Sequence, residues 1–152
     1  MQIRLIDEKD AVAVSALCID SFSVAVAPSL SLEGVETFKN IASENSFLER
    51  MTKDSTILVC EEHGSIIGVI ELKRGQHIAM LFVSPDRQET GVGRALFSAI
   101  LPFVTEETVT VSASLSSIPA YLKYGFVYAG DQDEKSGLVF QPMEYTSVTQ
   151  SQ

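Results

Sequence analysis

A glycine-containing loop that opens a helix is the part of this sequence best suited to chemistry. Residues 81–100 read LFVSPDRQETGVGRALFSAI, where an apolar strand stops at Pro85 and Gly91 and Gly93 begin an apolar helix. Glycine allows positive φ and a close approach of the backbone to a ligand. A helix leaves its first N–H groups unpaired, and here they are predicted to point at one spot. These groups belong to Val92, Gly93, Arg94 and Ala95.

This arrangement favours an anion site, most naturally for phosphate, because the helix dipole adds positive potential there. Arg87 and Arg94 add cationic charge nearby. Two common phosphate loops do not match. A dinucleotide fingerprint needs a third glycine where this chain has Leu96, and a P-loop needs a Gly-Lys-Ser/Thr sequence that this chain lacks. A plain glycine-containing turn between strand and helix is the interpretation without a ligand.

A third phosphate loop, the pyrophosphate loop of acyl-CoA-dependent acyltransferases, does match. Residues 88–93 read QETGVG and fit the Gln/Arg-x-x-Gly-x-Gly/Ala signature of the GNAT superfamily. Residues 82–85, FVSP, fit the apolar-Val-x-Pro sequence that precedes the loop in that family, and residues 121–126, YLKYGF, fit its Tyr-x-Lys-x-Gly-Phe element. The chain therefore resembles a single GNAT acetyltransferase domain over residues 1–146, followed by a polar tail at 147–152.

The resemblance implies an acetyl-CoA cosubstrate, no metal, and a set of residues that bind the cosubstrate. The strand ending at Val83 and the strand at 108–114 would splay apart and hold the thioester in the resulting V. Ser112 belongs to the same site, where relatives often have the longer Asn. The backbone of Phe82 and Val83 would pair with pantetheine. The loop would bind the pyrophosphate through Gln88, Glu89, Gly91, Val92, Gly93 and Arg94.

Amide formation by direct attack requires a base for the amine, a hydrogen-bond donor for the oxyanion and an acid for the leaving thiolate. In the family the oxyanion donor is the backbone N–H at Val83. Tyr121 holds the position of the tyrosine that protonates the CoA sulfur. Tyr124 is a second candidate for that role, and an amphipathic tyrosine of the core is the structural interpretation of Tyr121.

His77 is the candidate base. Several family members place a Glu on the central strand at the position that, counted back from Gln88, is His77 here. Histidine, with an ordinary pKa of about 6.5, is a sound base at neutral pH. Ordered water as the base, or a strand histidine satisfied by a neighbour, is the alternative. Strand alternation predicts two faces. These are formed by His77, Ala79 and Leu81, and by Ile78, Met80 and Phe82.

The elements that must position these residues alternate between strand and helix patterns. Strands are predicted at 2–5, 55–62, 65–74, 75–83, 108–114, 126–129 and 138–145, with a polar turn at 131–137. Helices are predicted at 11–22, from the cap Ser31 onward, and at 44–51, 91–101 and 118–124. The expected fold is α/β, the GNAT fold: a mixed, mostly antiparallel sheet of about seven strands, with helices on both faces and the central strands splayed in a V.

The acceptor side is expected to come from residues 22–52. Phe22, Phe38 and Phe47 either line it or pack in the core, and core packing is the better interpretation. Residues 1–72 hold 12 acidic against 5 basic side chains, which suits a cationic amine but also a plain solvated surface. The predicted function is transfer of an acetyl group to a primary amine of a small molecule or peptide. A non-catalytic acyl-CoA-binding sensor or interaction module is the alternative.

Composition sets the remaining expectations. A length of 152 residues suits one domain, and a net charge of −9 argues against nucleic-acid or anionic-membrane partners. Cys18 and Cys60 are expected to be reduced and buried. No apolar run approaches the roughly 20 residues of a membrane span, and the N-terminus lacks a signal-peptide pattern. A cytoplasmic location is therefore expected, and a homodimer is left open because dimers are common in the family.

Overall fold

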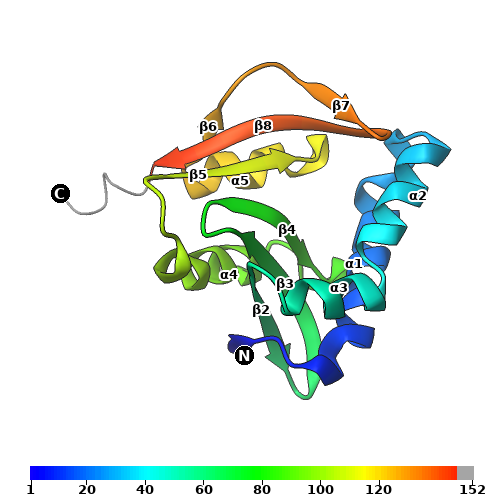
Figure 1. The fold of residues 1–152 in the computed structure, drawn as a ribbon, viewed down its shortest axis with the longest axis vertical. Coiled ribbons are helices and arrows are strands. Elements are labelled where there is room, and N and C mark those ends of the chain that lie inside the picture. Colours follow the sequence, from blue (N-terminus) through cyan, green and yellow to red (C-terminus); the bar gives the residue numbers. More distant parts are fainter. Residues whose placement is uncertain (147–152) are drawn as a thin grey trace.

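A central sheet with helices on both sides forms the fold (Figure 1). The computed structural model describes residues 1–146, so the polar tail predicted at 147–152 lies outside the described part. The strands are β1 Gln2–Leu5, β2 Ser55–Glu62, β3 Ser65–Lys73, β4 His77–Val83, β5 Thr108–Ala113, β6 Val127–Tyr128, β7 Asp133–Lys135 and β8 Leu138–Thr146. The helices are α1 Ala11–Ala25, α2 Leu32–Ile41, α3 Glu44–Met51, α4 Val92–Ile100 and α5 Ile118–Tyr124.

Strand pairing makes the sheet mixed and mostly antiparallel. The strand order is β1-β2-β3-β4-β5-β8-β6, and β7 pairs with β8. Only β4 and β5 pair in parallel among the described strands. The predicted α/β architecture is therefore confirmed. The sheet has eight strands rather than about seven, because β7 folds back on β8 inside the segment predicted to be a polar turn.

The helices cover the two faces of the sheet separately and enclose two cores. α1, α2 and α3 pack over the face that carries Val59 and Val69, which we call the α1 face. α4 and α5 pack over the face that carries Leu58 and Ile70, which we call the α4 face. Neighbouring residues of β2 and β3 thus enter opposite cores, as strand alternation requires.

The parallel pair β4 and β5 separates along its length. The two strands are in register only at His77 with Thr110 and at Ile78 with Val111. Beyond these positions β4 stays paired with β3, and β5 stays paired with β8. Figure 1 shows β5 and β8 running together, apart from β2, β3 and β4. The predicted V is therefore present, with its closed end at Ile78 and Val111.

A β-bulge in β4 changes the faces predicted by alternation. Leu72 of β3 pairs with Ile78, while the preceding Glu71 pairs with Met80, so Ala79 is the extra residue. Ile78 consequently enters the core of the α4 face, whereas Met80 enters the core of the α1 face. The prediction that Ile78 and Met80 share a face was wrong for this reason.

Helix boundaries follow their capping residues. The side chains of Ser31 and Ser43 each accept a hydrogen bond from an N–H group in the first turn of α2 and α3. α3 and α5 begin and end where the sequence predicts. α1 continues past its predicted end to Ala25, and α4 ends at Ile100, after which Pro102 lies in a 3-10 turn.

Candidate active site

The loop between β4 and α4 presents the free N-terminus of a helix. Gly91 has a positive φ of 92° and immediately precedes α4. The Ala95 N–H donates to the Gly91 carbonyl at 3.0 Å, so the prediction that Ala95 offers an unpaired N–H was wrong. Among residues 1–146 the N–H groups of Val92, Gly93 and Arg94 have no backbone acceptor. These three N–H groups are therefore free to donate to an anion at the start of α4.

The cationic side chains near the loop already have partners. Arg87 forms an ion pair with Glu62 at 2.5 Å. Arg94 donates to the Lys123 carbonyl at 2.8 Å, and its guanidinium lies 5.4 Å from the centre of the Tyr124 ring. Glu62 neutralises the charge of Arg87. The partner of Arg94 is a neutral carbonyl, so the positive charge of Arg94 is not neutralised and remains beside the helix.

Gly93 is required by packing as well as by the loop. A Cβ atom built at Gly93 would overlap the Tyr124 hydroxyl, whereas one at Gly91 would meet no atom within 4 Å. Glycine is therefore needed at position 91 because φ is positive there, and at position 93 because Tyr124 approaches the backbone closely. Glu89, with a φ of 64°, adds a second left-handed position that glycine content does not indicate.

The main chain of β4 offers unpaired groups to the gap between β4 and β5. The Ser84 N–H donates to the Ile67 carbonyl at 2.8 Å, which fixes the hydrogen-bonded positions of the β3–β4 ladder. In an antiparallel ladder these positions alternate. Phe82 therefore directs its N–H and C=O toward β3, while Leu81 and Val83 direct theirs into the gap. Phe82 contributes its side chain to this region rather than its main chain.

Leu81 is the site residue that the sequence reasoning missed. Its N–H points into the gap nearer the closed end than that of Val83 does. The Val83 carbonyl already accepts hydrogen bonds from Ser21 Oγ at 3.1 Å and from Gln88 Nε2 at 3.3 Å. No signal in the sequence distinguishes Leu81 from its neighbours, because the hydrogen-bond register is set by strand pairing and not by residue type.

His77 lies at the closed end of the V. Its Nδ1 is 2.8 Å from Thr110 Oγ1, which leaves Nε2 as the other ring nitrogen. The side chain is half-buried, and burial lowers the pKa of His77, with smaller contributions from Lys73 and Arg74. The ring is therefore neutral at pH 7, the state a base requires. Thr110 is a second residue that the sequence reasoning missed.

Tyr121 and Tyr124 lie together against the core of the α4 face. Tyr121 is 5% exposed and meets Phe126 edge to face at a ring-centre distance of 5.2 Å. Burial raises the pKa of Tyr121 far above its ordinary value, and it also raises the pKa of the half-buried Tyr124. Both phenols therefore keep their protons near neutral pH. Tyr124 belongs to α5, and its hydroxyl lies beside Gly93 in the first turn of α4. This position separates Tyr124 from the closed end of the V.

The α1 face carries the remaining residues of interest. Phe22, Phe38 and Phe47 are buried in the core, as the core interpretation predicts. Phe82 is only half-buried and meets Phe38 edge to face at 5.4 Å. Ser112 is exposed on β5, between two residues that enter the opposite core, so it also faces this side.

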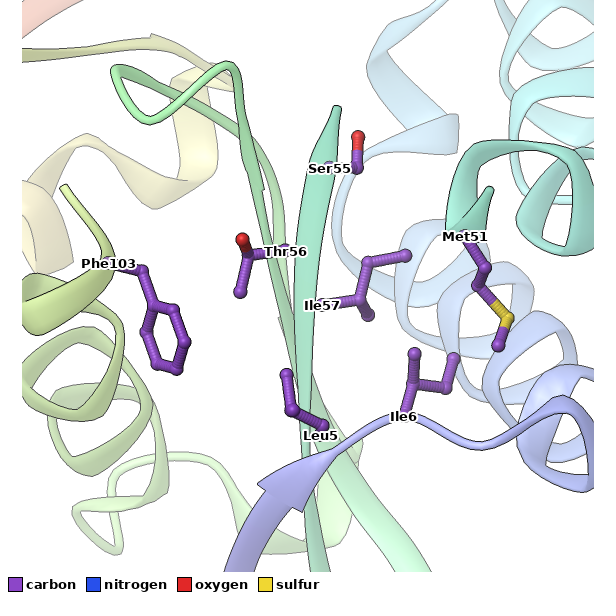
Figure 2. A pocket seen from close by; sticks show the side chains of 7 residues that line it. All are labelled: Leu5, Ile6, Met51, Ser55, Thr56, Ile57 and Phe103. Atoms are coloured by element: carbon purple, nitrogen blue, oxygen red, sulfur yellow. The ribbon is translucent and has the colours of Figure 1, made fainter. Parts of the chain in front are cut away.

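A shallow pocket of about 350 Å³ lies elsewhere, around the start of β2 (Figure 2). Thr56 and Phe103 lie on one side of the strand, and Ile57 and Met51 on the other. None of the residues that line it belongs to the loop before α4 or to β4 and β5, which border the gap. The pocket is therefore separate from the candidate active site.

Residues 1–146 also bear on metal binding, membrane spanning and thiol chemistry. In this range no group of three His, Cys, Asp or Glu side chains is arranged to hold a metal ion. None of the helices in the same range is long and apolar enough to cross a bilayer. Cys18 and Cys60 are both free and buried, as predicted, and burial raises the pKa of Cys60.

Known proteins are similar to this chain in sequence and fold. The model of the acetyltransferase (GNAT) domain family matches residues 26–147. An uncharacterized N-acetyltransferase, YafP of Escherichia coli strain K12, is 27% identical over 126 residues, which cover 83% of this chain and 81% of that protein.

Two solved structures extend the comparison. The GCN5-related N-acetyltransferase (aminotransferase, class-II) from Rhodopseudomonas palustris superposes with a TM-score of 0.84 at 25% identity, covering 95% of this chain and 94% of that one. The PaiA N-acetyltransferase from Thermoplasma acidophilum, solved in complex with coenzyme A, gives a TM-score of 0.76 at 18% identity, covering 96% and 99%.

Proposed function

The chain belongs to the GNAT family of acetyltransferases, and from this premise we propose that it transfers the acetyl group of acetyl-CoA to a primary amine of a small molecule or peptide by direct attack. One observation carries the proposal. Unpaired main-chain groups of β4 line a gap that runs from the closed end of the V to the free N-terminus of α4. The free and buried cysteines and the acidic surface also suit a cytoplasmic enzyme.

The gap and the helix end fit the two chemical parts of coenzyme A. A pyrophosphate matches the N–H groups of Val92, Gly93 and Arg94, where the helix dipole and the Arg94 charge add attraction. An amide-bearing pantetheine arm matches the main chain of Leu81 and the N–H of Val83, which would otherwise lack partners. In this proposal Gln88 and Glu89 shape the loop, Ser112 borders the gap, and Phe82 contributes its side chain to the acceptor side.

The acetyl thioester supplies an activated carbonyl carbon, and the residues of this chain move the protons. His77 Nε2 takes one proton from the acceptor ammonium, and the amine nitrogen forms a bond to the carbonyl carbon. The N–H of Leu81, which lies nearer the closed end of the V than that of Val83, donates to the carbonyl oxygen while it carries negative charge. When the carbon–sulfur bond breaks, the Tyr121 phenol supplies a proton to the thiolate, and the second proton that the amine nitrogen loses as the amide forms returns to the Tyr121 phenolate.

The experiment that tests the proposal measures thiol release. The purified chain is mixed with acetyl-CoA and a panel of primary amines, and free CoA is detected with a thiol reagent. We expect amine-dependent release above the rate of spontaneous hydrolysis. Tight CoA binding in a calorimetric titration without release by any amine would favour a non-catalytic acyl-CoA sensor, and the absence of CoA binding would overturn both functions.

A further inference from the structure

We propose that Glu144 is a specificity residue that holds a second positive charge on the acceptor, while the reacting amine lies at His77. This inference rests on the proposed acetyl transfer to an amine. It narrows the acceptor class to amines that carry another cationic group a few bonds from the reacting nitrogen.

The first observation is a row of three side chains across the sheet. His77 of β4 is the register partner of Thr110 of β5, and Thr110 is the register partner of Glu144 of β8. Register partners project from the same face. The neighbours Val111 and Met143 enter the core of the α4 face, so the row lies on the α1 face. Across two strand spacings the Cα atoms of His77 and Glu144 are roughly 10 Å apart.

The second observation is that Glu144 is available to a ligand. It is half-buried, and within residues 1–146 its carboxylate has no ion pair or hydrogen bond. Between it and His77 stands Thr110, whose short side chain already bonds to the imidazole. The two longer side chains therefore flank the shorter Thr110 side chain on the α1 face.

The third observation is that charge changes sign along the row. Lys73, the register partner of His77 on β3, and the adjacent Arg74 lie on one side of the imidazole. Glu144 lies on the other side. An acceptor with a second positive charge is repelled from the β3 side and attracted to the β8 side, because each spacing along the row is within about one Debye length, roughly 8–10 Å at ordinary salt. One orientation of the acceptor is thereby favoured.

The carboxylate suits a second charge better than the reacting one. A carboxylate beside the reacting ammonium would favour its protonated form and so oppose the loss of a proton that attack requires. Glu144 is two strands away from His77, so it can bind a second cation without raising the pKa of the reacting ammonium. We therefore assign Glu144 to the non-reacting cation.

The row also lies at the end of the gap toward which the thioester is expected to point. If the pyrophosphate binds at α4, the pantetheine arm runs along β4 from Val83 back to Ile78. That distance is about 17 Å at 3.3 Å per strand residue, comparable with an extended pantetheine arm. Because the arm starts at α4, beyond Val83, its sulfur end comes close to Leu81 and points toward the closed end of the V, where Ile78 pairs with Val111 and His77 with Thr110.

The test compares three amines that share a four-carbon chain: butylamine, aminobutanol and diaminobutane. Acetyl transfer is measured for the wild-type chain, for Glu144→Gln and for Glu8→Gln. Glu8 is an exposed acid near the N-terminus, so its variant makes the same change in net charge away from the site. We expect the wild-type KM for diaminobutane to be about five-fold or more below that for aminobutanol. Glu144→Gln should remove this difference by raising the KM for diaminobutane alone, while Glu8→Gln leaves it unchanged.

Two outcomes would overturn the proposal. One is a KM for diaminobutane that Glu144→Gln does not alter, or that Glu8→Gln alters equally. The other is a loss in Glu144→Gln that affects all three amines alike, since that indicates a structural role. Continued turnover of butylamine in either case leaves the proposed acetyl transfer standing, whereas a wild-type chain that releases no thiol with any amine overturns both.

Discussion

Replacing His77 by Gln tests the base with a change that keeps some hydrogen-bonding capacity. Burial and the charges of Lys73 and Arg74 lower the pKa of His77. The neutral, basic form therefore persists to lower pH, and the acid limb of kcat/KM should lie below about pH 6.5, the ordinary value for histidine. His77→Gln should lower kcat/KM by roughly 10²- to 10⁴-fold, typical of lost general-base catalysis, and should abolish the limb.

The hydrogen bond to Thr110 determines which tautomer of His77 is productive. If Nδ1–H donates to Thr110 Oγ1, then Nε2 carries a lone pair and can accept a proton. If the threonine hydroxyl donates instead, Nε2 is protonated and cannot act as the base. A hydrogen bond of about 1 kcal/mol corresponds to roughly five-fold in rate, so Thr110→Val should cost about that factor and Thr110→Ser should recover it.

The assay is kcat/KM for acetyl transfer from pH 5 to pH 9, with released CoA as the readout. His63→Asn is the matched control, because His63 is exposed in the β2–β3 turn at a φ of 51°, which Asn tolerates. Its profile should overlay that of the wild type. If the profile of His77→Gln also overlays the wild type, the base is water or another group, and His77 is a structural residue that joins β4 to β5.

Three further predictions concern other parts of the chain. Tyr121→Phe should lower kcat by about 10²- to 10⁴-fold with unchanged CoA affinity by calorimetry, and equal kcat would remove Tyr121 from the mechanism. Gly93→Ala should weaken CoA binding; if adding Tyr124→Phe restores the affinity, the glycine serves the tyrosine and not the ligand. Arg50→Ala leaves the fully buried Glu71 carboxylate without its 2.8 Å ion pair and should cost about 3 kcal/mol or more in urea unfolding, whereas a loss below about 1 kcal/mol would contradict this.

Much of the fold could be predicted because local signals agree with the tertiary structure. The serine caps of α2 and α3 and the alternation of β2 and β3 each fix an element without long-range information. β7 escaped prediction because its residues, DEK, are all exposed and polar. Only the partner strand β8 gives such a segment a reason to be extended.

The residues of the candidate site also differ in whether a local signal or a distant strand determines their position. The loop from Gln88 to the start of α4 could be recognised because glycine spacing reports directly on backbone requirements. Leu81, Thr110 and Glu144 could not be recognised, since each owes its place to strand register. Register depends on which residues of distant strands face one another, and the sequence of a single strand does not contain that information.

The bulge at Ala79 links the fold to the proposed chemistry. Under strict alternation, Met80 and Phe82 on the α1 face would require His77 to face α4, together with Leu81. The extra residue reverses the alternation of side chains on its N-terminal side. His77 therefore shares the α1 face with Thr110, while Ile78 enters the core of the α4 face. Above the bulge, Leu81 and Val83 still direct their main chain into the gap. A single inserted residue thus allows one strand to offer main-chain groups to a thioester along its edge and an imidazole to an amine on its face.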